Sequence, residues 1–460
     1  MGRCWLLLVV LSLVGCERAR PYSPHRANPA HAELTQHPAT RPVPEDWVWQ
    51  DVGRSPWEGK TALEFVTFEA KPQEWTELKQ FWNPPQGDGQ PVRLKVPRGL
   101  DDPTGYIPDS NPPTLDKWQL GRDLFYARDW LDESGQLSCA RCHDPNQGFS
   151  DGRRESAWGK NTPTLENIVY ARSLFHDGRA SFLEEVVQQR PQDEVEGRPH
   201  AWPGVIRRLR ASPQWKKRFE AVFDFEPTQD ALGQVMATYL RTLLSGDSLV
   251  DRAVGLAGGV APEAKHFQPL LDKANLRPLG SAEAKPAEVA AQLAHAWKLF
   301  HGPAGCVACH PSGHTLWSDG RYHNIGIDGT GEVLSDPPRQ GRFRVSPLGE
   351  KNRYLLGAWR TPTLRSLSRT APYFHNGEQA DLQAAIARHV RPEPFPRERN
   401  YYLAPKLAKP DGSRRLFDVS DQDLRALTLL LQALDGGPVD AAVGPPAQET
   451  PTPPPMSNTP

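Results

Sequence analysis

The chain has 460 residues, which is room for two or three domains, and a formal net charge of -1 from 54 basic and 55 acidic residues. This balance excludes a strongly basic nucleic-acid-binding protein and a long charged tail. The longest apolar run, from Trp5 to Val14, is too short to span a bilayer.

The N-terminus has the pattern of an export signal. The apolar run follows a short basic start and ends in Leu-Val-Gly before Cys16, which is typical of a bacterial lipoprotein cleaved before a lipid-bearing cysteine. An ordinary secretory signal with a chance cysteine is the alternative. Glu17 is not the Asp that favours inner-membrane retention. We therefore expect a signal over residues 1–16, a flexible tether over 17–44, and a periplasmic protein attached by lipid to the outer membrane.

The hydrophobic periodicity predicts a mainly α-helical chain with short β elements and long loops. Helices are expected over residues 181–190, 202–211, 228–244, 380–390 and 420–434. The expected organisation is a Trp- and Pro-rich extension at 45–113, a first domain at 114–250, a connector at 251–290, a second domain at 291–436, and a disordered tail at 437–460.

The two expected domains contain the same ordered set of motifs. Each has CxxCH, then an aromatic residue followed by Ser-Asp-Gly-Arg, then Thr-Pro-Thr-Leu, then His-(Asp/Asn)-Gly. The step from Thr162 to His176 is 14 residues, and the step from Thr361 to His375 is the same. Four matches in order with a shared spacing indicate an internal duplication, and hence two homologous domains.

The CxxCH motifs indicate covalent haem attachment. Two cysteines add to the haem vinyl groups, and the adjacent His binds the iron. Zinc would need four gathered ligands, and a redox dithiol needs no His. Cys4 leaves with the signal and Cys16 takes the lipid, so no pair remains for a disulfide. We therefore expect two c-type haems, held by Cys139, Cys142, His143, Cys306, Cys309 and His310.

The sixth iron ligand decides whether a haem transfers electrons or reacts with small molecules. Methionine is a common sixth ligand, and the chain has three: Met1, Met236 and Met456. The first leaves with the signal, the last lies in the expected tail, and Met236 sits within an expected helix far from both CxxCH motifs. A His/Met haem is therefore not expected.

The stretches LGRDLFYARD, CARCHDPNQGFSDGR, NTPTLENIVYARSLFHDGRA, FHGPAGCVACH, YHNIGI and RTPTLRSLSRTAPYFHNG closely resemble the bacterial diheme cytochrome c peroxidase family, which includes the MauG-type enzymes. The resemblance covers residues 118 to 435. It implies tandem c-type cytochrome domains, a peroxide-reactive first haem and an electron-transfer second haem.

In that family the second haem takes its other axial ligand 14 residues after the second His-(Asp/Asn)-Gly histidine, as Met or Tyr. The same step from His375 reaches His389. Leu382, Ile386 and His389 share one helical face. The resemblance thus implies that His389 binds the second iron, whereas a lone His in this position would otherwise be a core or capping residue. Replacing Met by His lowers a haem's reduction potential.

The resemblance also implies roles around the first haem. Typical peroxidases can block this haem with a His after the motif, but no other His lies between His143 and Asn161, which implies an open site. The family's catalytic acid position falls on Glu196, and a distal Arg190 could stabilise charge as the O–O bond breaks. A solvated Glu and a surface Arg are the alternatives. Val186 stands where the family has Gln, and Gln188 or Gln189 could fill that role.

Between the haems, His176 stands where the family has Trp, so Tyr170, Trp158 or direct tunnelling could carry electrons instead. A calcium ion is implied at Asn161, Thr370 and Pro372, the last two through backbone carbonyls.

Three functions remain open. A peroxidase would reduce hydrogen peroxide with electrons from a small exported c-type cytochrome or cupredoxin. A MauG-like enzyme would oxidise Trp or Tyr of a partner protein. A non-enzymatic electron-transfer cytochrome would need the first haem closed, by His176 or His200.

Overall fold

The computed structural model describes most of the chain between residues 93 and 446, together with a short piece before it. The described residues are 64–66, 93–101, 103–108, 110–111, 113–153, 160–186, 202–271, 284–347, 352–391, 403–407, 417–439 and 443–446. The expected signal and tether, most of the Trp-rich extension, and the candidate residues Glu196, Arg190 and Trp158 lie outside these ranges.

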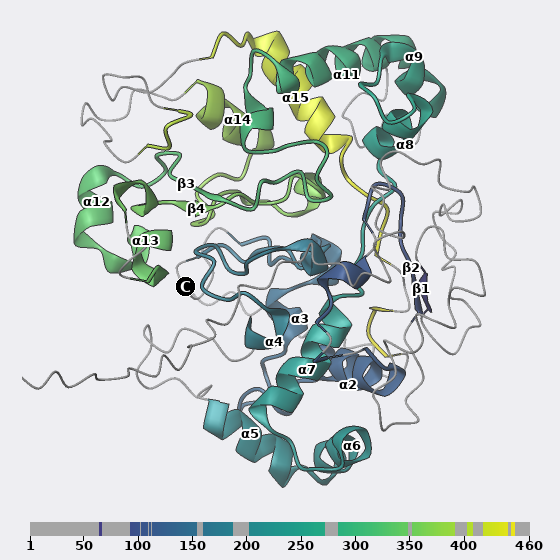
Figure 1. The fold of residues 1–460 in the computed structure, drawn as a ribbon, viewed down its shortest axis with the longest axis vertical. Coiled ribbons are helices and arrows are strands. Elements are labelled where there is room, and N and C mark those ends of the chain that lie inside the picture. Colours follow the sequence, from purple (N-terminus) through teal and green to yellow (C-terminus); the bar gives the residue numbers. More distant parts are fainter. Residues whose placement is uncertain are drawn as a thin grey trace, which may run out of the picture.

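The described residues are mainly helical, as expected, with short strands only (Figure 1). β1 (Glu64–Val66) pairs in parallel with β2 (Arg93–Lys95), and β3 (Tyr322–His323) pairs antiparallel with β4 (Trp359–Arg360). The helices are α2 (Leu115–Tyr126), α3 (Cys139–Cys142), α4 (Leu183–Val186), α5 (Trp202–Ala211), α6 (Pro213–Phe223), α7 (Gln229–Leu240), α8 (Leu249–Leu256), α9 (Ala264–Phe267), α11 (Pro286–His301), α12 (Thr330–Ser335), α13 (Arg342–Val345), α14 (Leu382–Val390) and α15 (Asp421–Gln432).

The first hydrophobic core forms around α2 and α7, which lie side by side in the lower part of Figure 1. Thr114 and Thr228 cap their N-termini through side-chain oxygens. At Gly121 the helices approach so closely that a Cβ atom would lie 2.1 Å from the Val235 carbonyl oxygen. This contact requires glycine and fixes the helix that leads into the first CxxCH.

The second core forms around α11 and α15, in the upper part of Figure 1. Capping boxes at Ser248 with Asp251 and at Ser420 with Asp423 start α8 and α15. α11 leads into the second CxxCH as α2 leads into the first. The buried residues of the described chain thus form two separate clusters, one for each copy of the repeat.

The duplication is visible in the backbone. Non-glycine residues with positive φ occur at matching positions of the two copies: Phe149 and Trp317, Asn167 and Ser366, Phe175 and Phe374. Positive φ is rare for side chains of these sizes. The shared turns show that the repeated sequence encodes a repeated conformation.

Two segments differ from expectation. The expected connector contains α8 and α9, and Phe267 is fully buried in the second core. Within the expected disordered tail, Val443 is buried in the first core, and its carbonyl accepts hydrogen bonds from the Tyr239 and Tyr126 hydroxyls at 2.7 and 3.3 Å. Low hydrophobicity predicted disorder there, but one apolar residue and a backbone acceptor are enough to fix this short piece.

The expected helices are otherwise present with shorter bounds. Residues 202–211 match α5, and the expectations at 228–244, 380–390 and 420–434 correspond to α7, α14 and α15. α4 covers 183–186 of the expected helix at 181–190, of which residues 187–190 lie outside the described ranges. The N-terminal ends of α7, α14 and α15 lie later in the chain than expected. Thr228, Asp381 and Ser420 act as their N-caps and therefore lie outside the helices.

Candidate haem sites

The histidines of both CxxCH motifs are held in the same way. The Nδ1 atom of His143 donates to the Phe149 carbonyl at 3.0 Å, and that of His310 donates to the Trp317 carbonyl at 2.8 Å. Phe149 and Trp317 begin the repeated aromatic-Ser-Asp-Gly-Arg motif. Such a bond fixes the ring and its tautomer, so that Nε2 is the nitrogen able to bind a metal.

A large, mostly apolar cavity adjoins the second CxxCH. Cys306, Cys309 and His310 line it on one side, and His389 of α14 lines it as well. Burial, with a smaller effect of the nearby His389, lowers the pKa of His310 to about 4, so His310 is neutral at physiological pH. A neutral imidazole is the form that binds iron.

His389 faces this cavity from α14 and is positioned by its own helix. Its Nδ1 atom donates to the Ala385 carbonyl one turn earlier at 2.8 Å, and the Phe374 ring lies 5.8 Å away. The same tautomer therefore holds at His389 and at His310. Two imidazoles with metal-binding Nε2 atoms and two thiols around one apolar cavity form a donor set that fits a c-type haem.

The thiols fit covalent attachment better than a zinc site. The four cysteines that the structure describes form no disulfide, and burial raises the pKa of the Cys306 thiol to about 12. A structural zinc site gathers four ligands, but among the described residues the group able to hold a metal ion has three members and lacks Cys306.

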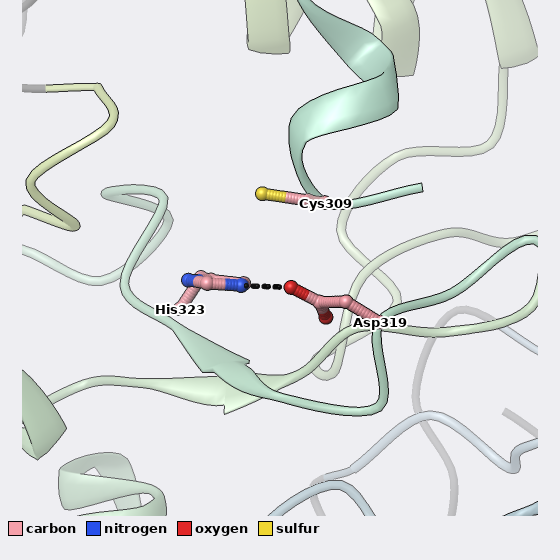
Figure 2. A group of neighbouring side chains, drawn as sticks. All are labelled: Cys309, Asp319 and His323. Carbon is pink, nitrogen blue, oxygen red and sulfur yellow. Dashed lines mark hydrogen bonds and ion pairs between the residues drawn. The ribbon is translucent and has the colours of Figure 1, made fainter. Parts of the chain in front are cut away.

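Next to the second CxxCH lies a group that the sequence analysis did not single out (Figure 2). Potential ligand atoms of Cys309, Asp319 and His323 lie within 4.8 Å of one another, and His323 Nε2 contacts Asp319 Oδ2 at 2.9 Å. Burial lowers the pKa of His323, but hydrogen bonds to Asp319 and Cys309 outweigh it and raise the pKa to about 9. Thioether formation at Cys309 would leave two ligands, too few for a metal site.

Asp319 belongs to the repeated Ser-Asp-Gly-Arg motif, and its partner His323 in β3 lies only four residues further along the chain. The pair fixes the turn after the second CxxCH.

Between the two copies, His176 and His375 occupy matching positions in different surroundings. His176 Nε2 donates to the Asn161 carbonyl at 2.8 Å, and burial lowers its pKa to about 3. His375 stacks on Trp359 at 4.0 Å and binds Asp328 Oδ2 at 3.0 Å. Both are held as structural rings, and Trp359 is an aromatic at this interface that sequence reasoning missed.

The candidate calcium residues come together at this interface. Asn161 Nδ2 donates to the Pro372 carbonyl at 2.6 Å, and Thr370 lines the same cavity. Asn161 Oδ1 is buried with no hydrogen-bond partner among the described residues. The two hydrogen bonds from Nδ2, to the Pro372 and Phe374 carbonyls, fix the orientation of this amide and leave Oδ1 available as a ligand. An unpartnered amide oxygen fits a hard cation such as calcium.

The residues that the family resemblance assigns to the distal side of the first haem, Glu196 and Arg190, lie outside the described ranges, as do Gln188, Gln189 and His200. Val186, the last residue of α4, is half-buried against the first core.

Comparison with known proteins agrees with this arrangement. Residues 115–258 match the family model of the di-haem cytochrome c peroxidases. This part of the chain thus matches the di-haem cytochrome c peroxidase domain, and the chain is similar to proteins named MauG and to cytochrome-c peroxidases. The methylamine utilization protein MauG of Methylorubrum extorquens is 28% identical over 340 residues, covering 72% of this chain and 81% of the relative. Cytochrome-c peroxidase IdrP1 of Denitromonas iodatirespirans is 29% identical over 309 residues, covering 61% and 74%.

Solved structures of the family share the fold. A MauG-like protein associated with microbial copper homeostasis aligns with a TM-score of 0.55 and 22% identity, covering 78% of this chain and 97% of that one. The Y463M variant of the diheme peroxidase BthA from Burkholderia thailandensis aligns with a TM-score of 0.50 and 19% identity, covering 76% and 93%. Within the described residues, no helix is both long and apolar enough to cross a membrane.

Proposed function

We propose that this oxidoreductase reduces hydrogen peroxide to water with electrons from a small exported donor, a c-type cytochrome or a cupredoxin. The observation that carries the proposal is the asymmetry of the two haem sites. His310 and His389 line one cavity with Nδ1 of each ring bonded to a carbonyl, which suits a closed electron-transfer haem. In the first copy the position that matches His389 is Arg190, so the first site has no corresponding histidine.

The assigned roles follow from that asymmetry. Haem c supplies the redox chemistry when it is attached. We propose that Cys139, Cys142 and His143 hold the peroxide-reactive haem in a cytochrome domain over residues 114–250. A second domain over residues 291–436 would hold the electron-transfer haem through Cys306, Cys309, His310 and His389. The two separate hydrophobic cores support this division.

At the first site, we assign proton transfer to Glu196. Its carboxylate would take a proton from bound peroxide and return it to the leaving oxygen. Arg190 would stabilise the negative charge that develops there. Calcium at Asn161, Thr370 and Pro372 would hold the two domains in register, and His176 would lie between the haems. The N-terminal signal favours a periplasmic enzyme anchored by a lipid on Cys16.

The runner-up function is MauG-like oxidation of Trp or Tyr in a partner protein. It is favoured by the two absences in sequence: no Met at the second haem, and no blocking His after the first CxxCH. A bis-His haem has a low potential and is a poor store of electrons for typical peroxidase turnover. Rapid oxidation of a reduced cytochrome by peroxide would support the peroxidase, whereas a long-lived oxidised state that decays with one partner protein would support the alternative.

The test is the low-temperature electron paramagnetic resonance spectrum of the ferric protein with both haems attached. We expect one high-spin and one low-spin bis-His signal of equal weight. His389→Ala should convert the low-spin signal to high-spin, and the exposed His295→Ala should leave both unchanged. Two low-spin signals in the unaltered protein would instead mean a closed first site and would favour plain electron transfer.

A further inference from the structure

Arg360 is a partly buried cation with no carboxylate partner among the described residues. It lies on β4 and lines the cavity between His310 and His389. Its Nε donates to the Phe175 carbonyl at 3.1 Å, and burial lowers its pKa. Arginine nevertheless stays charged in proteins. Among the described residues, no Asp or Glu forms an ion pair with it.

The two fully buried arginines of the described chain do have such partners. Arg365 binds both carboxylate oxygens of Asp251, at 2.8 and 2.9 Å, and Arg241 pairs with Glu184 at 2.8 Å. Arg360 lines the cavity, so a group that fills the cavity would bury it further. A buried charge without a counter-ion is strongly unfavourable, so a group that brings its own negative charge to Arg360 is favoured there.

The duplication shows that this position was changed in one copy. Arg360 corresponds to Asn161, the residue before each Thr-Pro-Thr-Leu. The backbone N–H of Asn161 donates to the His375 carbonyl at 2.8 Å, and the backbone N–H of Arg360 donates to the His176 carbonyl at 2.8 Å. Their side chains also make matching hydrogen bonds. Asn161 Nδ2 donates to the Phe374 carbonyl at 3.0 Å, and Arg360 Nε donates to the equivalent Phe175 carbonyl. The same cradle thus presents a neutral amide in one copy and a guanidinium in the other.

We propose that Arg360 is the counter-ion of a propionate of the haem bound between His310 and His389, and that its charge raises the reduction potential of that haem. This inference rests on the proposed occupancy of the cavity by haem c. A planar guanidinium matches a carboxylate with two parallel hydrogen bonds. A positive charge nearby favours the reduced iron, which carries one charge fewer. Arg360 thereby offsets part of the lowering that two histidine ligands cause.

The test compares Arg360→Gln, Arg360→Lys and the control Arg321→Gln. Arg321 lies next to β3, and its side chain is exposed. Spectroelectrochemical titration of each diheme protein should show a lower potential for the second haem in Arg360→Gln, a smaller fall in Arg360→Lys, and no change in Arg321→Gln. Unchanged potential in Arg360→Gln, with both haems attached and the low-spin signal intact, overturns the proposal.

Arg360→Lys keeps the proposal testable if the Gln variant does not fold. Lysine is a point charge and cannot form the planar pair. The reduced-minus-oxidised infrared difference spectrum should show a shifted carboxylate stretch in Arg360→Lys and none in Arg321→Gln. An unshifted band in both overturns the proposal. Failure of the proposed function looks different, because the unaltered protein would then lack a second haem or its low-spin signal.

Discussion

The two copies of the repeat share the same backbone turns but differ in charge at particular side chains. Both turn at the aromatic residue after CxxCH, and both use that carbonyl to orient the motif histidine. The residue after each Thr-Pro-Thr-Leu is Glu166 in one copy and Arg365 in the other. Sequence identity in the repeat therefore marks what holds a haem, and sequence difference marks what distinguishes the two haems.

Glu166 links the two copies, whereas Arg365 does not. Glu166 accepts hydrogen bonds from Ser366 and from Arg369 of the second copy, the latter at 2.9 Å. Arg365 pairs instead with Asp251 of α8, whose neighbours Val250 and Ala253 lie in the second core. The same position therefore makes a contact between the copies in one case and a contact within its own core in the other.

The largest effect is expected at Glu196. Only the first copy has an acid 20 residues after its His-(Asp/Asn)-Gly histidine, because the same step from His375 reaches Phe395. Loss of a general acid–base group costs about 100- to 10,000-fold in rate. Glu196→Gln should lower peroxide reduction by that factor in stopped-flow assays, while the exposed Glu133→Gln should not. If the two variants were equally active, Glu196 would have no catalytic role, and this position would not distinguish the function of the first copy from that of the second.

Breaking the buried pair of the second copy should cost the most stability. Arg365→Met leaves Asp251 buried without its cation, and removes hydrogen bonds to the Gly99 and Thr315 carbonyls. We expect a loss of about 3–5 kcal/mol in the free energy of unfolding, measured by urea denaturation. Glu166→Gln should cost less, because Arg369 is partly exposed and the Ser366 hydrogen bond can persist. A larger loss in Glu166→Gln would reverse this ranking.

The sequence predicted what local spacing determines. CxxCH and its following turn, the helical face that carries His389, and the duplication itself depend on residues close together in the chain. Contacts between separate motifs were not predictable in this way. Examples are the stacking of Trp359 on His375 and the hydrogen bond from the Arg360 backbone N–H to the His176 carbonyl. Nothing in local sequence marks these partners.

The tail and the connector failed expectation for a related reason. Composition predicted irregular structure at both places. Phe267 and Val443 nevertheless reach hydrophobic cores formed by distant residues. Burial of single apolar side chains is a tertiary property, and it overrides a weak local preference.

A smaller difference between the two copies is expected in calcium binding, which should depend on Asn161 of the first copy. Asn161→Ala removes the amide oxygen, and should weaken calcium binding at least about tenfold in isothermal titration calorimetry. Asn161→Asp supplies a carboxylate at the same place and should retain binding. One ion per chain is expected, because the guanidinium of Arg360 occupies the matching position. Unchanged affinity in Asn161→Ala would place the ion elsewhere.

The smallest effect is expected at the His323–Asp319 pair beside the second CxxCH. Burial opposes the charged form of Asp319, but hydrogen bonds from His323 and from the Arg321 backbone outweigh it and lower its pKa to about 2. Burial opposes the charged form of His323 as well, but Asp319 and the free Cys309 thiol together raise the pKa of His323 to about 9. In the diheme protein Cys309 is a thioether, so the part of this rise that comes from Asp319 remains. A raised histidine pKa stabilises the fold fully below its unfolded value of about 6.5, and this contribution is lost as the pH rises through the folded-state pKa. The lowered pKa of Asp319 stabilises above about 4, and its contribution is lost as the pH falls through 2.

His323→Gln should therefore destabilise the diheme protein by about 1 kcal/mol between roughly pH 4 and 6.5, because a partly exposed pair contributes modestly. The difference from the unaltered protein should shrink toward about pH 10, where His323 is neutral in both states. His295→Gln breaks a similar His–Asp contact with Asp423 at 2.7 Å, but His295 is half exposed, so its effect should be smaller at every pH. A pH-independent loss in His323→Gln would mean that the ring acts by packing rather than by charge, and the second copy would then owe its fixed turn to shape alone.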